Sequence, residues 1–257
     1  IRLLTRDASR AIDADFLAKR LKRAVKLRDR MIGVPHYRLI HAEADGLPGC
    51  VVDRFGDVLV VEPNSAGMER LSDQLVATLD KMLRPKAIVL SGDGPARALE
   101  GLEPMHRLAK GSLDGPIDVI EHGGHFLADA SAGQKTGWFY DQRDNRLLAA
   151  RFARDADVLD LYAYSGGFGI QAARHGAKSV LCVDRSAPAI ALVRQAAERN
   201  EAAARVTSEV AEAFEFLEMA AATHRTFDLV IADPPAFVKA KKDFHQGGRA
   251  YRKLARM

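Results

Sequence analysis

The sequence predicts an α/β protein in which a doubly wound parallel sheet follows a small α+β domain. After Trp138, apolar strand-like segments alternate with helical ones, which is typical of a parallel sheet covered on both faces. Between residues 35 and 130, strand-like segments are instead separated mainly by turn signals. The chain has 257 residues and 47% hydrophobic content, which suffices for two cores.

The first 34 residues predict a strand followed by one amphipathic helix. Residues 1–5, "IRLLT", have the pattern of a strand, and apolar residues recur at helical spacing between Asp13 and Met31. The opposite side of this helix is basic, with Lys19, Lys22, Arg23, Lys26 and Arg30. Such a face is ordinarily solvated surface, and direct contact with RNA is the alternative.

Residues 35–130 predict a small α+β domain. The turn signals "DGLPG" and "RFGD" separate apolar segments between Tyr37 and Glu62, which predicts a β-hairpin or meander. A helix is expected over residues 68–83, a strand in "KAIVLSG", and further short strands over residues 103–129 around a Gly123-Gly124 turn.

Residues 131–257 predict the doubly wound sheet. We expect helices over 141–153, 168–175, 187–201 and 212–222, and strands over 157–163, 179–184, 205–210 and 227–232. The preceding segment joins Gln134, Lys135 and Thr136 to the aromatic pair Trp138 and Phe139. Because buried donors without partners are costly, this polar segment is interpreted as a lid or positioning loop.

The strand ends of this half predict an adenosine cofactor. Asp184 ends the second strand, where a carboxylate can accept hydrogen bonds from both ribose hydroxyls; capping of the next helix is the alternative. The first strand contains Asp160 and leads into "SGGFG", which lacks the G-x-G-x-x-G spacing of a pyrophosphate-binding turn. Glu212, after the third strand, is a candidate for the adenine amino group or simply a first-turn acid.

The fourth strand ends in an abrupt change of chain direction. Pro234 and Pro235 follow Asp233 directly, and they leave its carboxylate at the sheet edge where α/β proteins bind ligands. An ordinary strand-ending turn would explain the same residues without a site. Beyond Phe237, Lys239, Lys241 and Lys242 form a basic loop that suits an RNA backbone or plain solvent.

The composition of the chain argues against several classes of protein. No apolar run approaches the roughly 20 residues of a membrane span, and the N-terminus is too charged for a secretory signal, so we expect a soluble cytoplasmic protein. The two cysteines, Cys50 and Cys182, lie in apolar strand-like segments, which favours buried thiols over a disulfide or a metal site. The net charge of +4 indicates a polyanionic partner only weakly.

Three motifs together resemble one family. "GQKTGWFYDQRDNR", "DLYAYSGGFGIQAARHGAKSVLCVDRS" and "DLVIADPPAFVKAKKD" occur in an order and spacing similar to the RlmI-type ribosomal RNA cytosine-5 methyltransferases. The resemblance implies a class I S-adenosylmethionine-dependent methyltransferase of large-subunit ribosomal RNA with a Rossmann-like domain. It divides the chain into residues 1–5, the last strand of a mostly absent PUA domain; 6–34, a linker helix; 35–130, the middle domain; and 131–257, a C-terminally truncated methyltransferase domain.

The resemblance also implies roles for individual residues. The implied cofactor site comprises Gln134, Lys135, Thr136, Asp160, Tyr162, Ser165, Gly166, Gly167, Phe168, Asp184, Arg185, Glu212 and Asp233. Within it, Gln134, Lys135 and Thr136 form the lid, and Asp184 meets the ribose. The target base is expected at Asp233, Pro234, Pro235 and Phe237, and no metal is implied.

One departure from the family affects the mechanism. Methylation at carbon 5 of cytosine needs a thiolate, and the family's cysteine lies in a Ser-Cys-Ser segment beyond the fourth strand, which we expect beyond Met257. Methylation of an exocyclic amine needs no cysteine, but Ala236 separates Pro235 from Phe237. An NAD-dependent oxidoreductase would also account for the glycine turn with Asp184, and an inactive RNA-binding chain would account for the basic helix. The oligomeric state stays open, a homodimer included.

Overall fold

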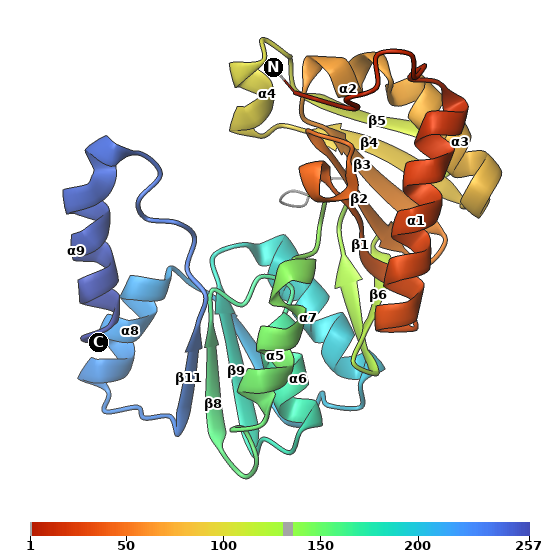
Figure 1. Cartoon of the computed structure of the whole chain (residues 1–257). Coiled ribbons are helices and arrows are strands. Elements are labelled where there is room, and N and C mark those ends of the chain that lie inside the picture. The colour runs from red at the N-terminus through yellow and green to blue at the C-terminus, as the bar shows by residue number, and fades with distance from the viewer. Residues whose placement is uncertain (1, 131–135) are drawn as a thin grey trace. The chain divides into compact units, whose positions relative to one another are not determined.

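The computed structural model describes residues 2–130 and 136–257, which form two compact units (Figure 1). The first unit comprises the chain up to Ile120 together with residues 128–140, and the second comprises residues 121–127 and 141–257. The chain passes between them at a hairpin of two strands, β6 (Ile117–Glu121) and β7 (Gly124–Ala128). No helix within the described residues is long and apolar enough to cross a membrane.

The first unit contains a five-stranded mixed sheet in the order β1-β2-β3-β4-β5. Its strands are β1 (His36–His41), β2 (Cys50–Phe55), β3 (Val58–Pro63), β4 (Ala87–Gly92) and β5 (Met105–Lys110). Only the β3–β4 pair is parallel among these neighbours. The hairpin between β2 and β3 turns at Gly56, whose φ of +64° suits glycine, and the predicted meander is thereby confirmed.

Short helices connect the strands of this unit. A 3-10 turn, η1 (Ala42–Asp45), follows β1, and α4 (Pro95–Leu99) follows β4. Residues 68–83 were expected as one helix, whereas the structure has α2 (Ala66–Arg70) and α3 (Ser72–Leu83). The break has a local cause, because the Ser65 hydroxyl caps α2 and the chain then bends at Leu71 before α3 begins.

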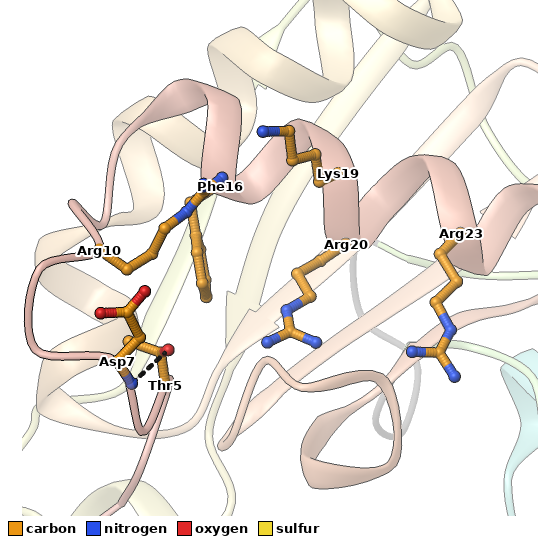
Figure 2. Close-up of a pocket in the computed structure, with 7 residues that line it drawn as sticks. All are labelled: Thr5, Asp7, Arg10, Phe16, Lys19, Arg20 and Arg23. Carbon is orange, nitrogen blue, oxygen red and sulfur yellow. Dashed lines mark hydrogen bonds between the residues drawn. The ribbon is translucent and has the colours of Figure 1, made fainter.

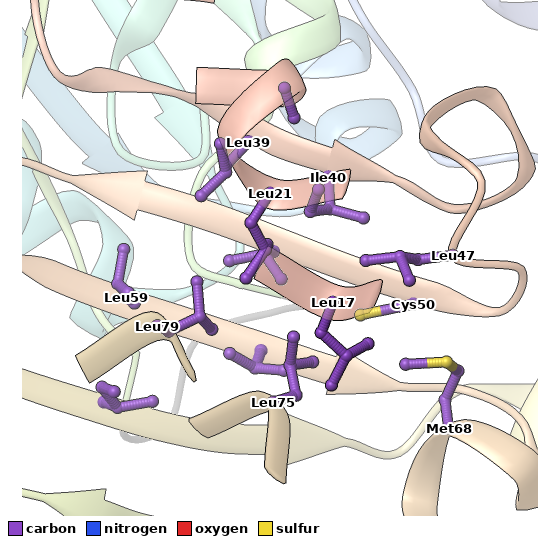
Figure 3. Close-up of a cluster of buried hydrophobic side chains, with 14 of the residues drawn as sticks. Leu17, Leu21, Leu39, Ile40, Leu47, Cys50, Leu59, Met68, Leu75 and Leu79 are labelled. Atoms are coloured by element: carbon purple, nitrogen blue, oxygen red, sulfur yellow. The ribbon is translucent and has the colours of Figure 1, made fainter. Parts of the chain in front are cut away.

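The basic helix α1 (Ala14–Ile32) is part of this unit's core. Asp13 caps its start by accepting a hydrogen bond from the Phe16 N–H, and Gly33 ends it with a φ of +77°. Its apolar stripe, including the fully buried Leu17 and Leu21, joins one cluster with side chains of α3 and the sheet (Figure 3). The helix expected as a linker therefore covers the sheet.

The strand expected over residues 1–5 is not present in its described part. Residues 2–5 pair with none of the described strands, and a strand requires a paired neighbour. Instead, the Arg2 guanidinium forms exposed ion pairs with Glu43 and Glu100. The expected strand is therefore not observed over residues 2–5, and the assignment of this segment to a separate domain stays a prediction.

The second unit is a doubly wound Rossmann-like α/β domain, as predicted. Its four parallel strands lie in the order β10-β9-β8-β11. They are β8 (Asp157–Leu161), β9 (Ser179–Asp184), β10 (Val206–Val210) and β11 (Leu229–Ala232). The helices are α5 (Arg143–Ala150), α6 (Gly167–Arg174), α7 (Ala187–Arg199), α8 (Ala213–Ala222) and α9 (Phe244–Leu254), with the 3-10 turn η3 (Lys241–Asp243). Another 3-10 turn, η2 (Tyr140–Gln142), begins in the last residue of the first unit and continues into the second.

Helices cover both faces of this sheet (Figure 1). On one face, Phe216 of α8 packs in a cluster with Leu159 and Leu181. On the other face, α6 comes so close that a Cβ at Gly169 would lie 2.4 Å from the Cys182 sulfur. The strand order reverses between β8 and β11, so the carboxyl ends of these two strands flank the position where doubly wound sheets bind ligands.

Candidate functional site

The predicted acids meet at the carboxyl edge of the parallel sheet. Leu161 of β8 is in register with Val183 of β9 and with Ala232 of β11. The residues that directly follow these three are Tyr162, Asp184 and Asp233. Because parallel strands end at one edge, the sequence and the pairing together place one carboxylate on each side of Tyr162, Asp184 on β9 and Asp233 after β11.

Asp160 lies on β8, two residues before Tyr162, and it is 1% exposed. Its Oδ2 accepts a hydrogen bond of 2.7 Å from the Gly169 N–H at the start of α6. Burial raises the pKa of Asp160 to about 7; the Gly169 N–H opposes this shift, and the charges of Asp233 and Asp184 add to it. The Asp160 carboxyl group thus connects the start of α6 to the sheet by a hydrogen bond, and its pKa depends on the charges of both neighbouring acids.

Asp184 is held in a fixed orientation by backbone donors. Its Oδ2 accepts from the Tyr164 N–H at 2.9 Å, and its Oδ1 accepts from the Ser186 N–H at 2.8 Å. The cap of the following helix is Ser186, whose hydroxyl accepts from the Ala189 N–H, so capping does not account for Asp184. A carboxylate has about four acceptor positions, which leaves capacity for hydroxyl donors such as those of a ribose.

The turn between β8 and α6 has an unusual backbone. Tyr162, Tyr164 and Gly166 all have positive φ, at +63°, +49° and +82°. Two tyrosines in this region store strain, and such strain is concentrated at ligand sites. Gly166 is the N-cap of α6, so the first N–H groups of that helix, beginning at Gly167, face the same edge.

Two buried hydroxyl groups at this turn point to a ligand. The Ser165 Oγ and the Tyr162 Oη are buried, and neither has a hydrogen-bond partner among the described residues. Burial raises the pKa of Tyr162 further above its ordinary value, with a contribution from the Glu212 charge. A buried polar group without a partner is destabilising, so a bound molecule with complementary groups would stabilise this turn.

The remaining predicted cofactor residues of this unit lie around the same edge. Glu212 occupies the N-cap position of α8 but makes no capping hydrogen bond, and its carboxylate lies 3.8 Å from the Arg185 guanidinium. Both side chains are largely exposed, so this ion pair holds them weakly. Phe168 lies at the start of α6, with the Arg146 guanidinium 6.0 Å from its ring centroid.

Asp233 and Phe237 lie where β11 ends. The Asp233 N–H donates to the Leu161 carbonyl at 3.4 Å, and the chain then leaves the sheet through Pro234 and Pro235. Phe237 is half-buried in a ring cluster, with centroids 6.4 Å from Tyr162, 6.1 Å from Phe214 and 4.7 Å from Tyr251. The Phe237 N–H also donates to the Tyr251 Oη at 3.2 Å.

Sequence reasoning did not identify Phe214 and Tyr251. They belong to helices α8 and α9, and no local pattern links either residue to Phe237. One signal was available: Gly247 in α9, where a Cβ would lie 2.5 Å from the Phe237 carbonyl oxygen. A glycine inside a helix often marks such a close backbone approach.

Of the predicted lid residues, the structure describes only Thr136. Gln134 and Lys135 lie outside the described residues. Thr136 belongs to the first unit and is fully buried, and its hydroxyl donates to the Asp53 Oδ2 at 2.5 Å. The loop lysines Lys239, Lys241 and Lys242 lie on the segment after Phe237. No group of potential metal ligands occurs among the residues that the structure describes.

Relatives of known name match nearly the whole chain. A protein of Shewanella denitrificans named ribosomal RNA large subunit methyltransferase I is 39% identical over 99% of the chain. Proteins of the same name from Cronobacter sakazakii and Escherichia coli are 36% identical over 98%. The chain spans 65% of the length of each. A family model described as conserved hypothetical protein 95 matches residues 145–246. These matches confirm the resemblance to ribosomal RNA large subunit methyltransferases, while cytosine-5 as the methylated position stays a prediction.

Solved structures confirm the predicted fold. A Streptococcus mutans protein provisionally named an S-adenosylmethionine-dependent methyltransferase has a TM-score of 0.80 at 22% identity, over 95% of this chain and 65% of that one. A provisionally named methyltransferase complexed with SAH has a TM-score of 0.78 at 22% identity, over 95% and 66%. An S-adenosylmethionine-dependent methyltransferase of Agrobacterium tumefaciens has a TM-score of 0.56 at 23% identity, over 74% of this chain and 58% of that one.

Proposed function

From homology over 98–99% of this chain to proteins named ribosomal RNA large subunit methyltransferase I, we propose that it binds S-adenosylmethionine and serves methyl transfer to large-subunit ribosomal RNA. The observation that carries the proposal is the row of Asp184, Tyr162 and Asp233 above the buried Asp160. Carboxylates in this position favour the sulfonium and ammonium cations of S-adenosylmethionine. They would repel the pyrophosphate of a dinucleotide.

The residues around the edge fit this cofactor chemically. The acceptor positions left on Asp184 suit the ribose hydroxyls, and Glu212, with Arg185 beside it, suits the adenine amino group. The unpartnered Ser165 hydroxyl and the N–H group of Gly167 at the start of α6 suit the methionine carboxylate. The cofactor, when bound, supplies the methyl group, while these residues orient it.

The target base would lie between Asp233 and Phe237. Asp233 accepts hydrogen bonds from the Watson–Crick edge of a flipped base, and the ring of Phe237 offers an apolar surface for its face. The aromatic cluster with Tyr251 and Phe214 fixes this ring. The two prolines set the direction in which the chain leaves the sheet, and thereby the separation of acid and ring.

For the product, we propose 5-methylcytosine. Carbon 5 becomes nucleophilic only after a thiolate has added to carbon 6, and the thiolate leaves again when the proton on carbon 5 is removed. Neither described cysteine can serve: burial raises the pKa of Cys50 to about 12, and it raises that of Cys182 well above its usual range. The proposed reaction therefore needs a thiolate from outside residues 1–257. Amine methylation, which needs none, is the competing product.

Calorimetric titration tests the cofactor assignment. We expect this chain to bind S-adenosylmethionine but not NAD, and the Asp184→Asn variant to bind it at least about tenfold more weakly, because a charged acceptor for two hydroxyls is lost. The Asp144→Asn variant is the control, since Asp144 is 94% exposed on α5. Binding of NAD alone, or equal binding by both variants, would contradict the proposal.

The position of the methyl group tests the product. Large-subunit ribosomal RNA is incubated with isotopically labelled cofactor and this chain, and the modified nucleoside is identified by mass spectrometry. Since the proposed thiolate lies outside these residues, we expect no methyl transfer to carbon by the 257-residue chain. Formation of 5-methylcytosine by this chain would contradict the thiolate requirement, and a methylated exocyclic amine would establish the competing product.

A further inference from the structure

The first unit carries a cationic cavity that the proposed methyl transfer does not use. It has a volume of about 380 Å³ and lies beside the N-terminal part of α1 (Figure 2). Four of its lining side chains are cations, Arg10, Lys19, Arg20 and Arg23, against the single acid Asp7. None of these four cations forms an ion pair within the described part of the chain. A lining with four cations and one acid has a net positive charge, which attracts anions.

Contacts within the chain orient one of the four cations, Arg20. The Arg20 guanidinium lies 5.1 Å from the ring centroid of Phe16, which is 4% exposed, and its Nη2 lies 3.5 Å from the Leu4 carbonyl. Gly46 leaves room for this group, because a Cβ there would lie 3.0 Å from it. An oriented guanidinium presents a planar fork that matches the oxygens of a phosphate.

Besides its cations, the cavity lining contains one hydroxyl group, that of Thr5, and one acid, Asp7. The Asp7 carboxylate accepts from the Ser9 hydroxyl and the Ser9 N–H, and these bonds lower the pKa of Asp7. The Thr5 hydroxyl accepts from the Asp7 N–H at 3.1 Å, so its own hydrogen can be donated to a ligand (Figure 2). An occupant with several acceptor oxygens suits this lining.

The positive charge continues along α1 beyond the cavity. Lys22, Lys26 and Arg30 are exposed, and from Lys19 to Arg30 the helix rises about 16 Å. Arg28 differs, because it is half-buried and forms a bidentate ion pair with Asp45. A row of this length exceeds what one phosphate group needs, and it fits a polymer that repeats its phosphates.

We propose that the cavity and the exposed basic face of α1 bind the sugar–phosphate backbone of RNA. The inference deepens the proposed function, on which it rests for the choice of RNA as the polyanion. Contacts to phosphates position a nucleic acid without reading its sequence, so this surface would hold the substrate while another site selects the base. The proposal assigns a role to the first unit, which the proposed chemistry at the sheet edge leaves without one.

Fluorescence anisotropy with a labelled fragment of large-subunit ribosomal RNA tests the proposal. The Lys19→Gln/Arg23→Gln double variant is compared with Lys81→Gln/Lys86→Gln, which removes two exposed charges elsewhere on the same unit. We expect the first pair to weaken RNA binding about tenfold and to lower the slope of log K against log salt by about one to two. Equal weakening by both pairs, or an unchanged slope, would overturn the proposal.

Competitors and a second readout separate the outcomes. We expect unlabelled RNA to displace the probe far better than inorganic phosphate or AMP at equal phosphate concentration. Displacement by polyglutamate as effective as by RNA would overturn the proposal in favour of an acidic protein partner. S-adenosylmethionine titration of the same variants should be unchanged. Failure of the unsubstituted chain to bind the cofactor would count against the proposed function only, and the RNA result would stand by itself.

Discussion

Asp160 is the residue whose chemistry depends most on its place in the fold. It is a carboxyl group under a glycine turn, and burial raises its pKa to about 7 from an ordinary value of 3.8. Below about pH 4 the group is protonated in both the folded and the unfolded chain, so it affects stability little. As the pH rises from about 4 to 7, the unfolded chain releases the proton first, and the folded state is progressively destabilised, by up to about 4 kcal/mol.

The Asp160→Asn variant should therefore lose this pH dependence. Asparagine keeps an oxygen to accept the Gly169 N–H but carries no charge at any pH. We expect the free energy of unfolding of the variant, relative to the unsubstituted protein, to rise by roughly 2–4 kcal/mol between about pH 4.5 and pH 7.5. Urea denaturation at the two pH values measures the difference. The exposed Asp144→Asn variant should show no such change, and a constant difference for Asp160→Asn would contradict the raised pKa.

At the scale of residues, the sequence predicts which side chains meet at the sheet edge, but not the hydrogen bonds and backbone conformations that orient them. Asp160, Asp184 and Asp233 could be predicted because each is tied to a strand end, and parallel strands share an edge. The backbone bonds from Tyr164 and Ser186 that orient Asp184 could not, since they depend on turn conformations. Positive φ at two tyrosines contradicts local preference, and only the surrounding packing enforces it.

At the scale of elements, one buried ion pair connects α5 to the hairpin. The Arg146 guanidinium donates to both carboxylate oxygens of Glu121, at 2.6 and 2.8 Å, and the two side chains are 4% and 0% exposed. The carbonyl of Glu121 also accepts from the Gln171 side chain of α6. The pair thus determines how α5, α6 and the end of β6 are assembled within the second unit.

Removing one partner of this pair should destabilise the unit strongly. We expect Arg146→Leu to lower the free energy of unfolding by about 3–5 kcal/mol, because the buried Glu121 carboxylate loses both hydrogen bonds from the Arg146 guanidinium. The exposed pair Arg185–Glu212 is the matched control, and Arg185→Leu should cost less than about 1 kcal/mol. Chemical denaturation measures both, and the Arg146→Leu/Glu121→Leu double variant should recover part of the loss. Equal effects of the two single substitutions would refute the argument.

The elements themselves follow the sequence closely in the second unit. Its four strands and α6 to α8 lie within a few residues of their predicted ranges, because apolar runs, glycine turns and helix caps act locally there. The basic helix shows the limit of such reasoning. Its spacing predicts a helix, but it does not predict what the apolar side of the helix packs against. Leu17 and Leu21 are buried because the sheet and α3 offer an apolar surface that this helix covers.

For the whole chain, two cores could be predicted, but their boundary could not. Residues 121–127 belong to the second unit and residues 128–140 to the first, although all of them were assigned near one domain border. The assignment rests on long-range bonds such as those of Asn200, whose side chain accepts from the His125 N–H and donates to the His125 carbonyl. No local pattern of residues 121–140 encodes that partner.

Two units with separate cores should respond separately to the proposed cofactor. Because the residues proposed to bind S-adenosylmethionine at the sheet edge belong to the second unit, we expect differential scanning calorimetry to resolve two transitions, of which only one shifts upward with cofactor. At a concentration about 100 times the dissociation constant the stabilisation is about 2.7 kcal/mol, which raises the melting temperature of a unit of this size by roughly 5–10 °C. The Asp184→Asn variant should lack the shift while both transitions persist. A shift of both transitions, or one that survives in the variant, would mean that the cofactor is not bound where the acids of the sheet edge predict.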